Sequence, residues 1–374
     1  MTPSALLTSP SDLHSGALDE TLEWLCAIPS PIGEEEAICD AVQARLSKLP
    51  LAAPIRRYGN SIVVPVTRGD GLPRIALVGH LDTVRTENGP ARIENGRCYG
   101  AGASDMKSGL AVMICIAELL ATVLKCELTL VFYAKEEGPF SENELGPVLA
   151  QDPDLAHVDL AVCLEPSNNL LHVGCTGSIH ATITVQGRTS HSARPWEGEN
   201  AITRAAPLLA KIGAIKPEEH VIEGHIYRSV FTVTQAKDGG RGRNVVPDRF
   251  IINLNHRFAP DTTLDDAELN LRMLIGDAGT IEITDLSPPA MPNAEHPLVL
   301  ALVAAGVKGV EPKQAWTDVA RFAQKGIRAV NFGPGENAQA HQKNESTSLA
   351  LVHEGFAIVK RWLTSLGPSA IPER

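Results

Sequence analysis

Apolar and polar residues follow one another in two different styles along the chain, and each style predicts a different kind of structure. In the first style, short continuous apolar runs typical of buried strands alternate with longer helical stretches. Strands are expected at 75–84, 126–135, 158–164 and 329–332, and helices in two pieces within 18–48, at 107–124, near 298–306 and near 347–366. This alternation predicts a parallel or mixed sheet that is covered by helices on both faces.

From about residue 178 to residue 291 the pattern changes to strands in which every second residue is apolar. Strands are expected at 179–186, 229–236, 250–258 and 280–284, and helices at 201–215 and 264–274. The order β-α-β-β-α-β is that of a ferredoxin-like α+β domain. The chain is therefore expected to form a mixed-sheet α/β domain from 1–177 and 292–374, with a smaller α+β domain, 178–291, inserted in it.

The composition of the chain argues against several kinds of binding partner and against secretion. A net charge of -11 argues against nucleic acid and anionic membranes, and 4% aromatic residues offer little for base stacking. The seven cysteines are scattered with no C-x-x-C pair, which favours free thiols in a reducing cytoplasm. No Lys or Arg precedes Arg45, so a secretory signal is not expected, and the apolar stretch 109–124, interrupted by Glu118, predicts a buried helix.

Two segments with candidate chemistry lie at or after the first predicted strand. In Gly79-His80-Leu81-Asp82, His80 could bind a metal while Asp82 holds its other ring nitrogen, although a loop histidine alone is also a common structural feature. The run GAGASDMKSG places Asp105 at a helix start, where it could be a ligand or a helix N-cap. The run lacks the spacing of a phosphate-binding P-loop.

Three further segments follow other apolar strands. Glu136 and Glu137 are adjacent carboxylates, of which one could bind a metal while the other acts as a base. Glu165 closes the strand at 158–164, and Gly333-Pro334-Gly335 leads to His341. Ligands collect at the carboxyl edge of such sheets, and carboxylate with imidazole suits zinc or its neighbours. Because these donors exceed what one tetrahedral ion needs, we infer two ions bridged by a carboxylate.

Read in order, GHLDTV, GAGASDMKSG, AKEEG, LEP and the late histidine closely resemble the dinuclear zinc aminoacylase and exopeptidase family. The family includes acetylornithine deacetylase, carboxypeptidase G and succinyl-diaminopimelate desuccinylase, and the resemblance covers nearly the whole chain. Three runs are most similar to the desuccinylases of actinobacterial type: GCTGSIHATITVQGRTSHSARPWEGENAI, GRNVVPD and WTDVARF with the following VNFGPGENAQAHQ. The resemblance implies a zinc-exopeptidase catalytic domain with an inserted domain that serves as lid and dimer contact.

The resemblance also implies a role for each matching residue. His80, Asp105 and Glu165 would hold one ion, and Asp105, Glu137 and His341 the other, so that Asp105 bridges them. Glu136 would be the general base and Asp82 would orient His80. The remaining implied residues contact substrate from the lid or near it: His191, which crosses into the partner's active site, Asn244, Arg257, Thr317 and Arg321.

These expectations combine into a homodimeric hydrolase with two divalent ions, Zn²⁺ first and Co²⁺ as the alternative. The expected reaction is hydrolysis of N-succinyl-LL-2,6-diaminopimelate to succinate and LL-2,6-diaminopimelate, in lysine and diaminopimelate biosynthesis. An acetylornithine-type deacetylase or a dipeptidase would use the same ligands, since only the acyl pocket distinguishes them. A catalytically silent metal-stabilised binding protein is the alternative of a different class, and the complete set of ligand and base residues argues against it.

Overall fold

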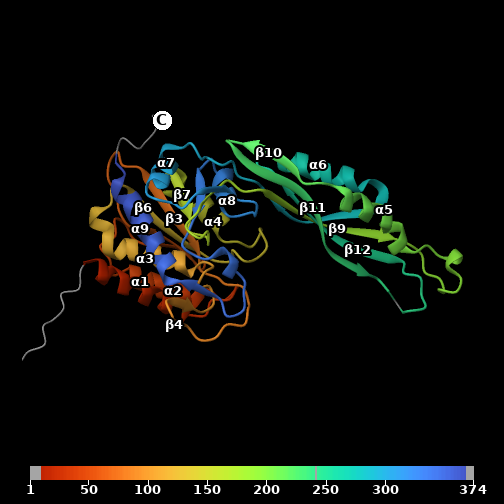
Figure 1. Cartoon of the computed structure of the whole chain (residues 1–374), viewed down its shortest axis with the longest axis horizontal. Helices are drawn as coiled ribbons and strands as arrows, with labels where there is room; N and C mark the ends of the chain where they lie inside the picture. Colours follow the sequence, from red (N-terminus) through yellow and green to blue (C-terminus); the bar gives the residue numbers. More distant parts are fainter. Residues whose placement is uncertain (1–9, 241, 368–374) are drawn as a thin grey trace, which may run out of the picture. The chain divides into compact units, whose positions relative to one another are not determined.

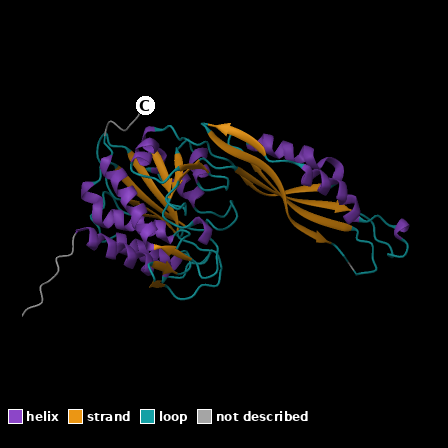
Figure 2. Ribbon diagram, viewed as in Figure 1, coloured by secondary structure: helices purple, strands orange, loops and turns teal. Residues whose placement is uncertain are grey.

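The computed structural model describes residues 10–240 and 242–367, and the chain divides into two compact units. The first unit comprises the described parts of Met1–Val173, Asn293–Glu311 and Arg321–Arg374. The second comprises Gly174–Pro292 with Pro312–Ala320, so the chain leaves the first unit and returns to it (Figure 1). Each unit has its own sheet, with helices packed on it (Figure 2).

The first unit is built on an eight-stranded mixed sheet. Its strands, in spatial order, are β1 (Arg56–Tyr58), β2 (Ser61–Pro65), β6 (Glu127–Tyr133), β3 (Arg74–His80), β7 (Leu160–Cys163), β15 (Ala329–Phe332), β8 (Leu171–Val173) and β14 (Val310–Pro312). The central strands β6, β3, β7 and β15 are mutually parallel, whereas β1–β2, β2–β6 and β15–β8 pair antiparallel. The expected mixed α/β sheet is therefore confirmed, and four strands end at the same edge.

Helices cover this sheet. They are α1 (Pro10–Cys26), α2 (Glu36–Leu46), α3 (Lys107–Leu120), α4 (Leu145–Gln151), α7 (Pro297–Ala304), α8 (Val319–Gln324) and α9 (Leu349–Ser365). The apolar α3 packs between α1 and α9 and against β3, and nearly all of its residues are buried, as its composition predicts. Glu118, which interrupts that apolar stretch, accepts two hydrogen bonds from the guanidinium of Arg45 on α2.

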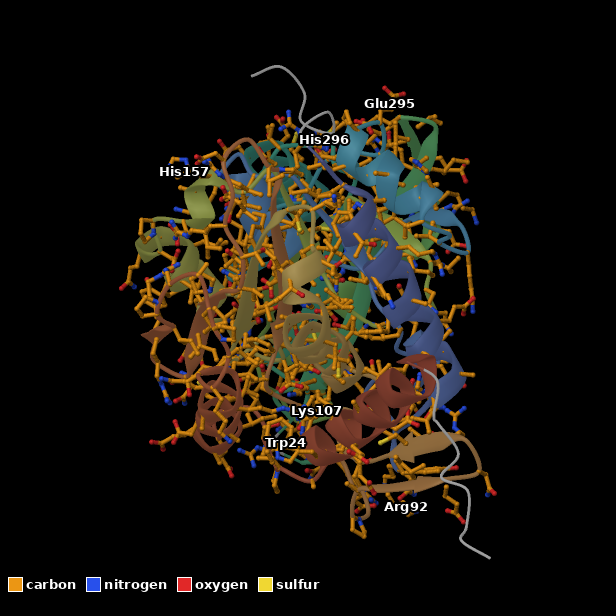
Figure 3. All side chains as sticks on the ribbon, turned by 90° about the vertical axis from the view of Figure 1, so that its left-hand side faces the viewer. Trp24, Arg92, Lys107, His157, Glu295 and His296 are labelled. Carbon is orange, nitrogen blue, oxygen red and sulfur yellow. The ribbon has the colours of Figure 1, made fainter. Side chains whose placement is uncertain are left out.

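A small three-stranded sheet lies apart from the main one. Its strands are β16 (Ser346–Ser348), β5 (Arg97–Tyr99) and β4 (Arg92–Glu94), and Figure 3 labels Arg92 on this ribbon at the edge of the first unit. Antiparallel pairing joins Thr347 of β16 to Cys98 of β5. The pairing therefore brings the segment after β15 beside the segment that leads into α3.

The second unit is a five-stranded antiparallel sheet with two helices. Its strands, in spatial order, are β10 (Glu218–Ile222), β11 (His225–Asp238), β12 (Arg249–Phe258), β9 (Gly177–Gln186) and β13 (Thr280–Ser287), and its helices are α5 (Ala201–Ala214) and α6 (Leu264–Ile275). Alternate residues of β9, such as Ile179, Ala181 and Ile183, are buried in a separate apolar core with residues of α5 and α6. The alternation therefore fixes which face of the sheet the helices cover.

The second unit carries one strand more than the sequence predicts, because β10 forms a hairpin with β11. Glu223 and Gly224 make the turn, and both have positive φ, 48° and 77°, as a two-residue hairpin turn requires. Most of β10 is exposed and it contains two glutamates, so no apolar alternation announces it. The expected β-α-β-β-α-β order is corrected to β-α-β-β-β-α-β.

The remaining short elements are 3-10 turns: η1 (Ala121–Val123), η2 (Leu155–His157), η3 (Pro195–Glu197), η4 (Gly276–Ala278) and η5 (Asn337–Gln339). All seven cysteines lie buried as free thiols. Within the described residues, no helix combines the length and the apolar character needed to cross a bilayer.

Candidate metal centre

The carboxyl edge of the parallel strands carries most of the candidate residues. His80 is the last residue of β3, Glu136 and Glu137 follow β6, and Glu165 follows β7. His341 lies in the loop after β15 and η5. Because parallel strands end at one edge, segments far apart in the sequence converge there.

The first group of potential metal ligands is His80, Asp105 and Glu165. The Nε2 atom of His80 lies 3.3 Å from Oδ1 of Asp105 and 4.0 Å from Oε1 of Glu165. One ligand atom from each residue lies within 4.8 Å of the other two, and all three residues are buried. This is the spacing that a single coordinated cation needs.

The second group is Asp105, Glu137 and His341. Nε2 of His341 lies 3.0 Å from Oε2 of Glu137 and 3.5 Å from Oδ2 of Asp105. Asp105 therefore offers one carboxylate oxygen to each group, which is the geometry of a bridging ligand. One potential ligand atom each of His80, Glu136 and Glu137 also lie within 4.8 Å of one another.

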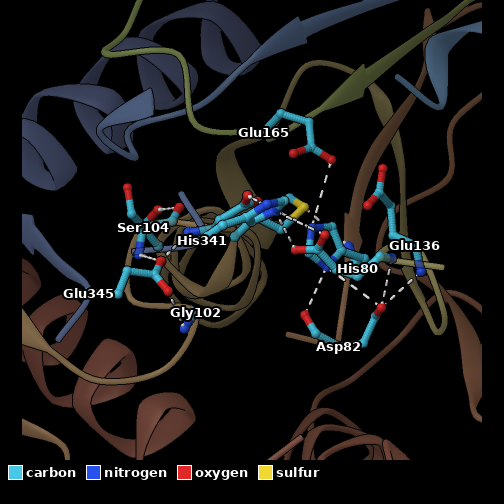
Figure 4. A network of polar contacts seen from close by, with 12 residues as sticks. His80, Asp82, Gly102, Ser104, Glu136, Glu165, His341 and Glu345 are labelled. Atoms are coloured by element: carbon cyan, nitrogen blue, oxygen red, sulfur yellow. Dashed lines mark hydrogen bonds and ion pairs between the residues drawn. The ribbon is translucent and has the colours of Figure 1, made fainter. Parts of the chain in front are cut away.

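The ring of His80 is held so that Nε2 faces the carboxylates. Nδ1 lies 2.9 Å from the backbone oxygen of Asp82, so it donates its proton there and leaves the Nε2 lone pair free for a metal. The Asp82 carboxylate is 3.6 Å from Nδ1 and instead accepts the backbone N–H groups of Glu136 and Glu137, at 3.0 and 2.9 Å. Figure 4 shows dashed lines from Asp82 both to His80 and to the Glu136 segment.

The charge of this region favours cations. Burial alone would lower the pKa of His80, but the hydrogen bond with Asp105 and the nearby carboxylates raise it well above its usual value. The hydrogen bond to Glu137 likewise raises the pKa of His341 to about 9. Five carboxylates (Asp82, Asp105, Glu136, Glu137 and Glu165) against two imidazoles leave an excess negative charge, and the donor set of imidazole and carboxylate suits divalent zinc or cobalt.

Two glycines allow the loop before His341 to approach the other ligand segments. A Cβ on Gly333 would lie 2.3 Å from the backbone oxygen of Glu165, and one on Gly335 would lie 2.2 Å from the backbone oxygen of Ser104. No larger residue fits at either place without moving backbone. The Gly333-Pro334-Gly335 segment is thus required for the close approach of three ligand-bearing segments.

Of the residues predicted to contact substrate, two lie together in the second unit. His191 and Asn244 are both exposed, and the N–H of Ser192 donates to the backbone oxygen of Asn244 at 2.9 Å. A β-bridge between His191 and Val245 joins the same two loops. Nδ1 of His191 accepts the N–H of Ala193 at 3.1 Å, which leaves Nε2 available.

The other predicted substrate residues are more buried. Arg257 lies near the opposite end of the second unit's sheet and donates from Nε to Oδ1 of Asn255 at 3.0 Å; burial lowers its pKa. Oγ1 of Thr317 is buried with no hydrogen-bond partner among the described residues. Arg321 stacks on the ring of Phe140 at 3.8 Å and donates to its backbone oxygen at 2.6 Å.

Glu345 is a residue that the sequence patterns did not single out. It lies four positions after His341, is 2% exposed, and accepts backbone N–H groups of Gly102, Ser104 and Asp105. Burial raises its pKa to about 7, although these three donors oppose the rise. A lone glutamate between Asn344 and Ser346 carries no periodic signal, so only the folded structure reveals this contact.

The sequence is similar to known proteins over most of its length. The model of peptidase family M20/M25/M40 matches residues 76–365. Succinyl-diaminopimelate desuccinylase from Corynebacterium glutamicum is 36% identical over 350 residues, covering 91% of this chain and 94% of that protein. A putative succinyl-diaminopimelate desuccinylase from Mycobacterium tuberculosis is 36% identical over 354 residues, covering 94% and 99%.

Solved structures show the same fold at low identity. A tripeptidase from Staphylococcus aureus superposes with a TM-score of 0.76 at 19% identity, covering 94% of this chain and 98% of that one. A dinuclear metal-binding peptidase of the M20 family from Bacillus subtilis gives a TM-score of 0.67 at 13% identity, covering 94% and 98%. These likenesses establish the two-unit fold.

Proposed function

The chain belongs to peptidase family M20/M25/M40, whose members are dinuclear metal hydrolases, and from this premise we propose that it hydrolyses N-succinyl-LL-2,6-diaminopimelate. The products would be succinate and LL-2,6-diaminopimelate, for lysine and diaminopimelate biosynthesis. The proposal is supported by 36% identity, over most of both chains, to the desuccinylase of Corynebacterium glutamicum.

The observation that carries the proposal is the sharing of Asp105 by two ligand groups, with Glu136 next to one of them in sequence. His80, Asp105 and Glu165 would hold one ion, and Asp105, Glu137 and His341 the other. When bound, a pair of divalent ions, Zn²⁺ or Co²⁺, would make a water acidic and polarise the carbonyl of the scissile amide.

Glu136 is the proposed proton carrier. Its carboxylate would accept a proton from the attacking water and return it to the nitrogen of the leaving amine, which is typically worth ~10²–10⁴-fold in rate. Its backbone N–H is fixed by the carboxylate of Asp82. The base is therefore held by the residue that also fixes His80 through its backbone oxygen.

The second unit is proposed to act as lid and dimer contact, with residues that bind an anionic substrate. Arg257 offers a guanidinium fork to a substrate carboxylate, as such planar donors do for bidentate acceptors. Asn244 and Thr317 of the same unit, and Arg321 of the first unit, are proposed to add polar contacts. In a homodimer, His191 of one subunit would reach the active site of the other and stabilise the oxyanion of the tetrahedral intermediate.

Turnover of matched substrates tests the proposal. Zinc-loaded protein is assayed with N-succinyl-LL-2,6-diaminopimelate, N-acetylornithine and a panel of dipeptides, with kcat/KM as the measured quantity. The succinyl compound is expected to be preferred. A higher kcat/KM on the acetyl compound or on a dipeptide would replace the desuccinylase assignment by a deacetylase or a dipeptidase, since both would use the same ligands.

A further inference from the structure

Glu345 is a buried carboxylate that the proposed mechanism does not use. Its side chain lies in the first unit, in the segment between His341 and β16, and the residue is 2% exposed. Burying a carboxylate costs free energy unless it is fully hydrogen-bonded. The partners of this carboxylate therefore indicate what it does.

All three side-chain partners belong to one loop. Oε1 of Glu345 accepts the backbone N–H groups of Ser104 and Asp105, each at 2.8 Å, and Oε2 accepts that of Gly102 at 2.9 Å. The backbone oxygen of Glu345 accepts a fourth N–H, from Gly100, at 3.1 Å. Figure 4 shows the carboxylate pointing at Gly102 and Ser104. Three backbone N–H groups of one loop on a single carboxyl group attach that loop to the Glu345 segment.

The loop that Glu345 grips carries the bridging ligand. The Asp105 amide is one of the donors, while its carboxylate lies 3.3 Å from Nε2 of His80 and 3.5 Å from Nε2 of His341. Fixing the backbone of Asp105 limits the directions in which its side chain can point. Because His341 is only four residues before Glu345, the same contact joins the loops of two ligands of one proposed ion.

The Glu345 segment is itself anchored on its other side. The backbone N–H of Glu345 donates to Oδ1 of Asn88 at 2.8 Å, and that of Asn344 donates to the backbone oxygen of Glu87 at 3.0 Å. A second, independent contact between the two ligand loops is the approach of Gly335 to Ser104, where a Cβ would lie 2.2 Å from the backbone oxygen. The carboxylate therefore links the Glu345 segment to the 100–105 loop, and the other contacts already hold these two segments close together.

We propose that Glu345 is a positioning residue of the metal centre, which aligns the bridging Asp105 with His341 by clamping the 100–105 loop. The carboxylate does not contact the ions or the substrate. Its effect is to preorganise the ligand pair Asp105 and His341, as partners of metal ligands commonly do. This deepens the proposed function and rests on it only for the presence of metal, not for the identity of the acyl group.

Metal titration tests the proposal without any substrate. E345Q keeps the shape of the side chain but turns an amide NH₂ toward backbone donors. Apo-protein is titrated with Co²⁺, following its absorption spectrum, and with Zn²⁺ by calorimetry. The dissociation constant of the more weakly bound ion is expected to rise about 10–100-fold, the range for loss of a partner that orients a ligand.

The matched control is E336Q. Glu336 lies in the same loop and forms an ion pair with Arg97, but its carboxylate does not contact the 100–105 loop. It is expected to lower the unfolding temperature of the apo-protein without changing the metal dissociation constants. A purely structural role for Glu345 predicts that E345Q behaves in the same way, with an unchanged cobalt spectrum.

H341A lacks one proposed histidine ligand. In a protein with this substitution, E345Q is expected to change the metal dissociation constants less than it does in the wild type. A folded E345Q protein with both metal constants within twofold of the wild type would overturn the proposal. If E345Q does not fold, E345D replaces it in the same titration, because it retains the charge but shortens the side chain. Its dissociation constant for the more weakly bound ion is expected to lie between that of the wild type and the value expected for E345Q. Failure of the desuccinylase assignment would instead appear in the substrate assay, with metal binding intact.

Discussion

The carboxylate of Asp82 accepts the backbone N–H of Glu136 at 3.0 Å, and so joins the loop after β3 to the loop after β6. The same carboxylate also accepts the N–H of Glu137 at 2.9 Å. One buried side chain thus fixes the proposed base and a proposed metal ligand together. The backbone oxygen of Asp82 at the same time determines which nitrogen of His80 faces the ions.

Replacing Asp82 by Asn should therefore lower turnover without unfolding the protein. The amide keeps one oxygen acceptor but turns an NH₂ group toward a backbone donor, so one of the two loop contacts is lost. We expect kcat to fall about 10–100-fold, as for other partners of metal-site residues. Steady-state kinetics on metal-loaded protein measures this, with thermal unfolding as the control for folding; kcat within twofold of the wild type would contradict it.

E136Q should separate chemistry from metal binding. The amide cannot accept a proton, so turnover is expected to fall by at least the ~10²–10⁴-fold typical of general-base catalysis. The ions should remain, since neither of the proposed ligand groups that share Asp105 includes Glu136. Metal content by elemental analysis and kcat on the same preparation check both statements. Retained activity would show that another residue is the base.

Mixing two inactive variants tests the proposed exchange of His191 between subunits. H191A and E136Q should each be inactive, but a heterodimer of the two has one site with both residues. Random exchange should restore up to about a quarter of wild-type activity, because half of the dimers are mixed and each mixed dimer has one complete site. Native mass spectrometry verifies that mixed dimers form. Mixed dimers without activity would place His191 outside the partner's site.

Gly109 should tolerate no side chain. A Cβ there would lie 2.4 Å from the backbone oxygen of Leu164, the residue before Glu165. G109A should therefore destabilise the protein by about 1–3 kcal/mol, as overpacking of a core does, and weaken metal binding by displacing Glu165. Gly213 in α5 is the matched control: a Cβ meets nothing within 4 Å, and G213A should stabilise its helix by about 0.5–1 kcal/mol. Urea unfolding measures both, and equal effects would refute the packing argument.

Stability should fall in alkali because buried thiols cannot ionise in the folded state. Burial raises the pKa of Cys126 from 9.0 to about 12. A raised pKa contributes stability that is fully present below pH 9 and is lost between pH 9 and 12. From pH 8 to pH 10 this thiol should account for about 1.4 kcal/mol of lost stability, and C126A should lose that much less. Urea unfolding at both pH values tests the difference, and identical losses would disprove it.

The sequence predicts the main sheets well, and it indicates which side chains gather at one edge of the first sheet, for a definite physical reason. Buried parallel strands are continuous apolar runs, and their carboxyl ends meet at one edge. Residues such as His80, Glu137 and Glu165, which lie at the end of such runs or shortly after them, can therefore be assigned to one edge before the fold is known. Strand ends are less well predicted: the first expected strand continued to residue 84, whereas β3 ends at His80.

Features without a periodic pattern were not predictable. The strands of the small sheet are three residues each, too short for alternation to show. The exposed β10 has no apolar face, and its turn, Glu223-Gly224, is not among the strongest hairpin signals. The contacts of Glu345, and the carboxylate of Asp82 bonding to amides rather than to His80, depend on three-dimensional approach that residue order does not encode.

The position of β15 has a consequence for biosynthesis. This strand fits between β7 and β8, and the loop after it brings His341, yet both are translated only after the whole second unit. A ribosome that stops within the second unit would release a polypeptide with four of the five proposed ligands and a gap in its central sheet. Such a truncated product could not bind the bridged pair of ions. Hydrolytic activity would therefore appear only after the segment that follows the second unit, with β15 and His341, has been translated.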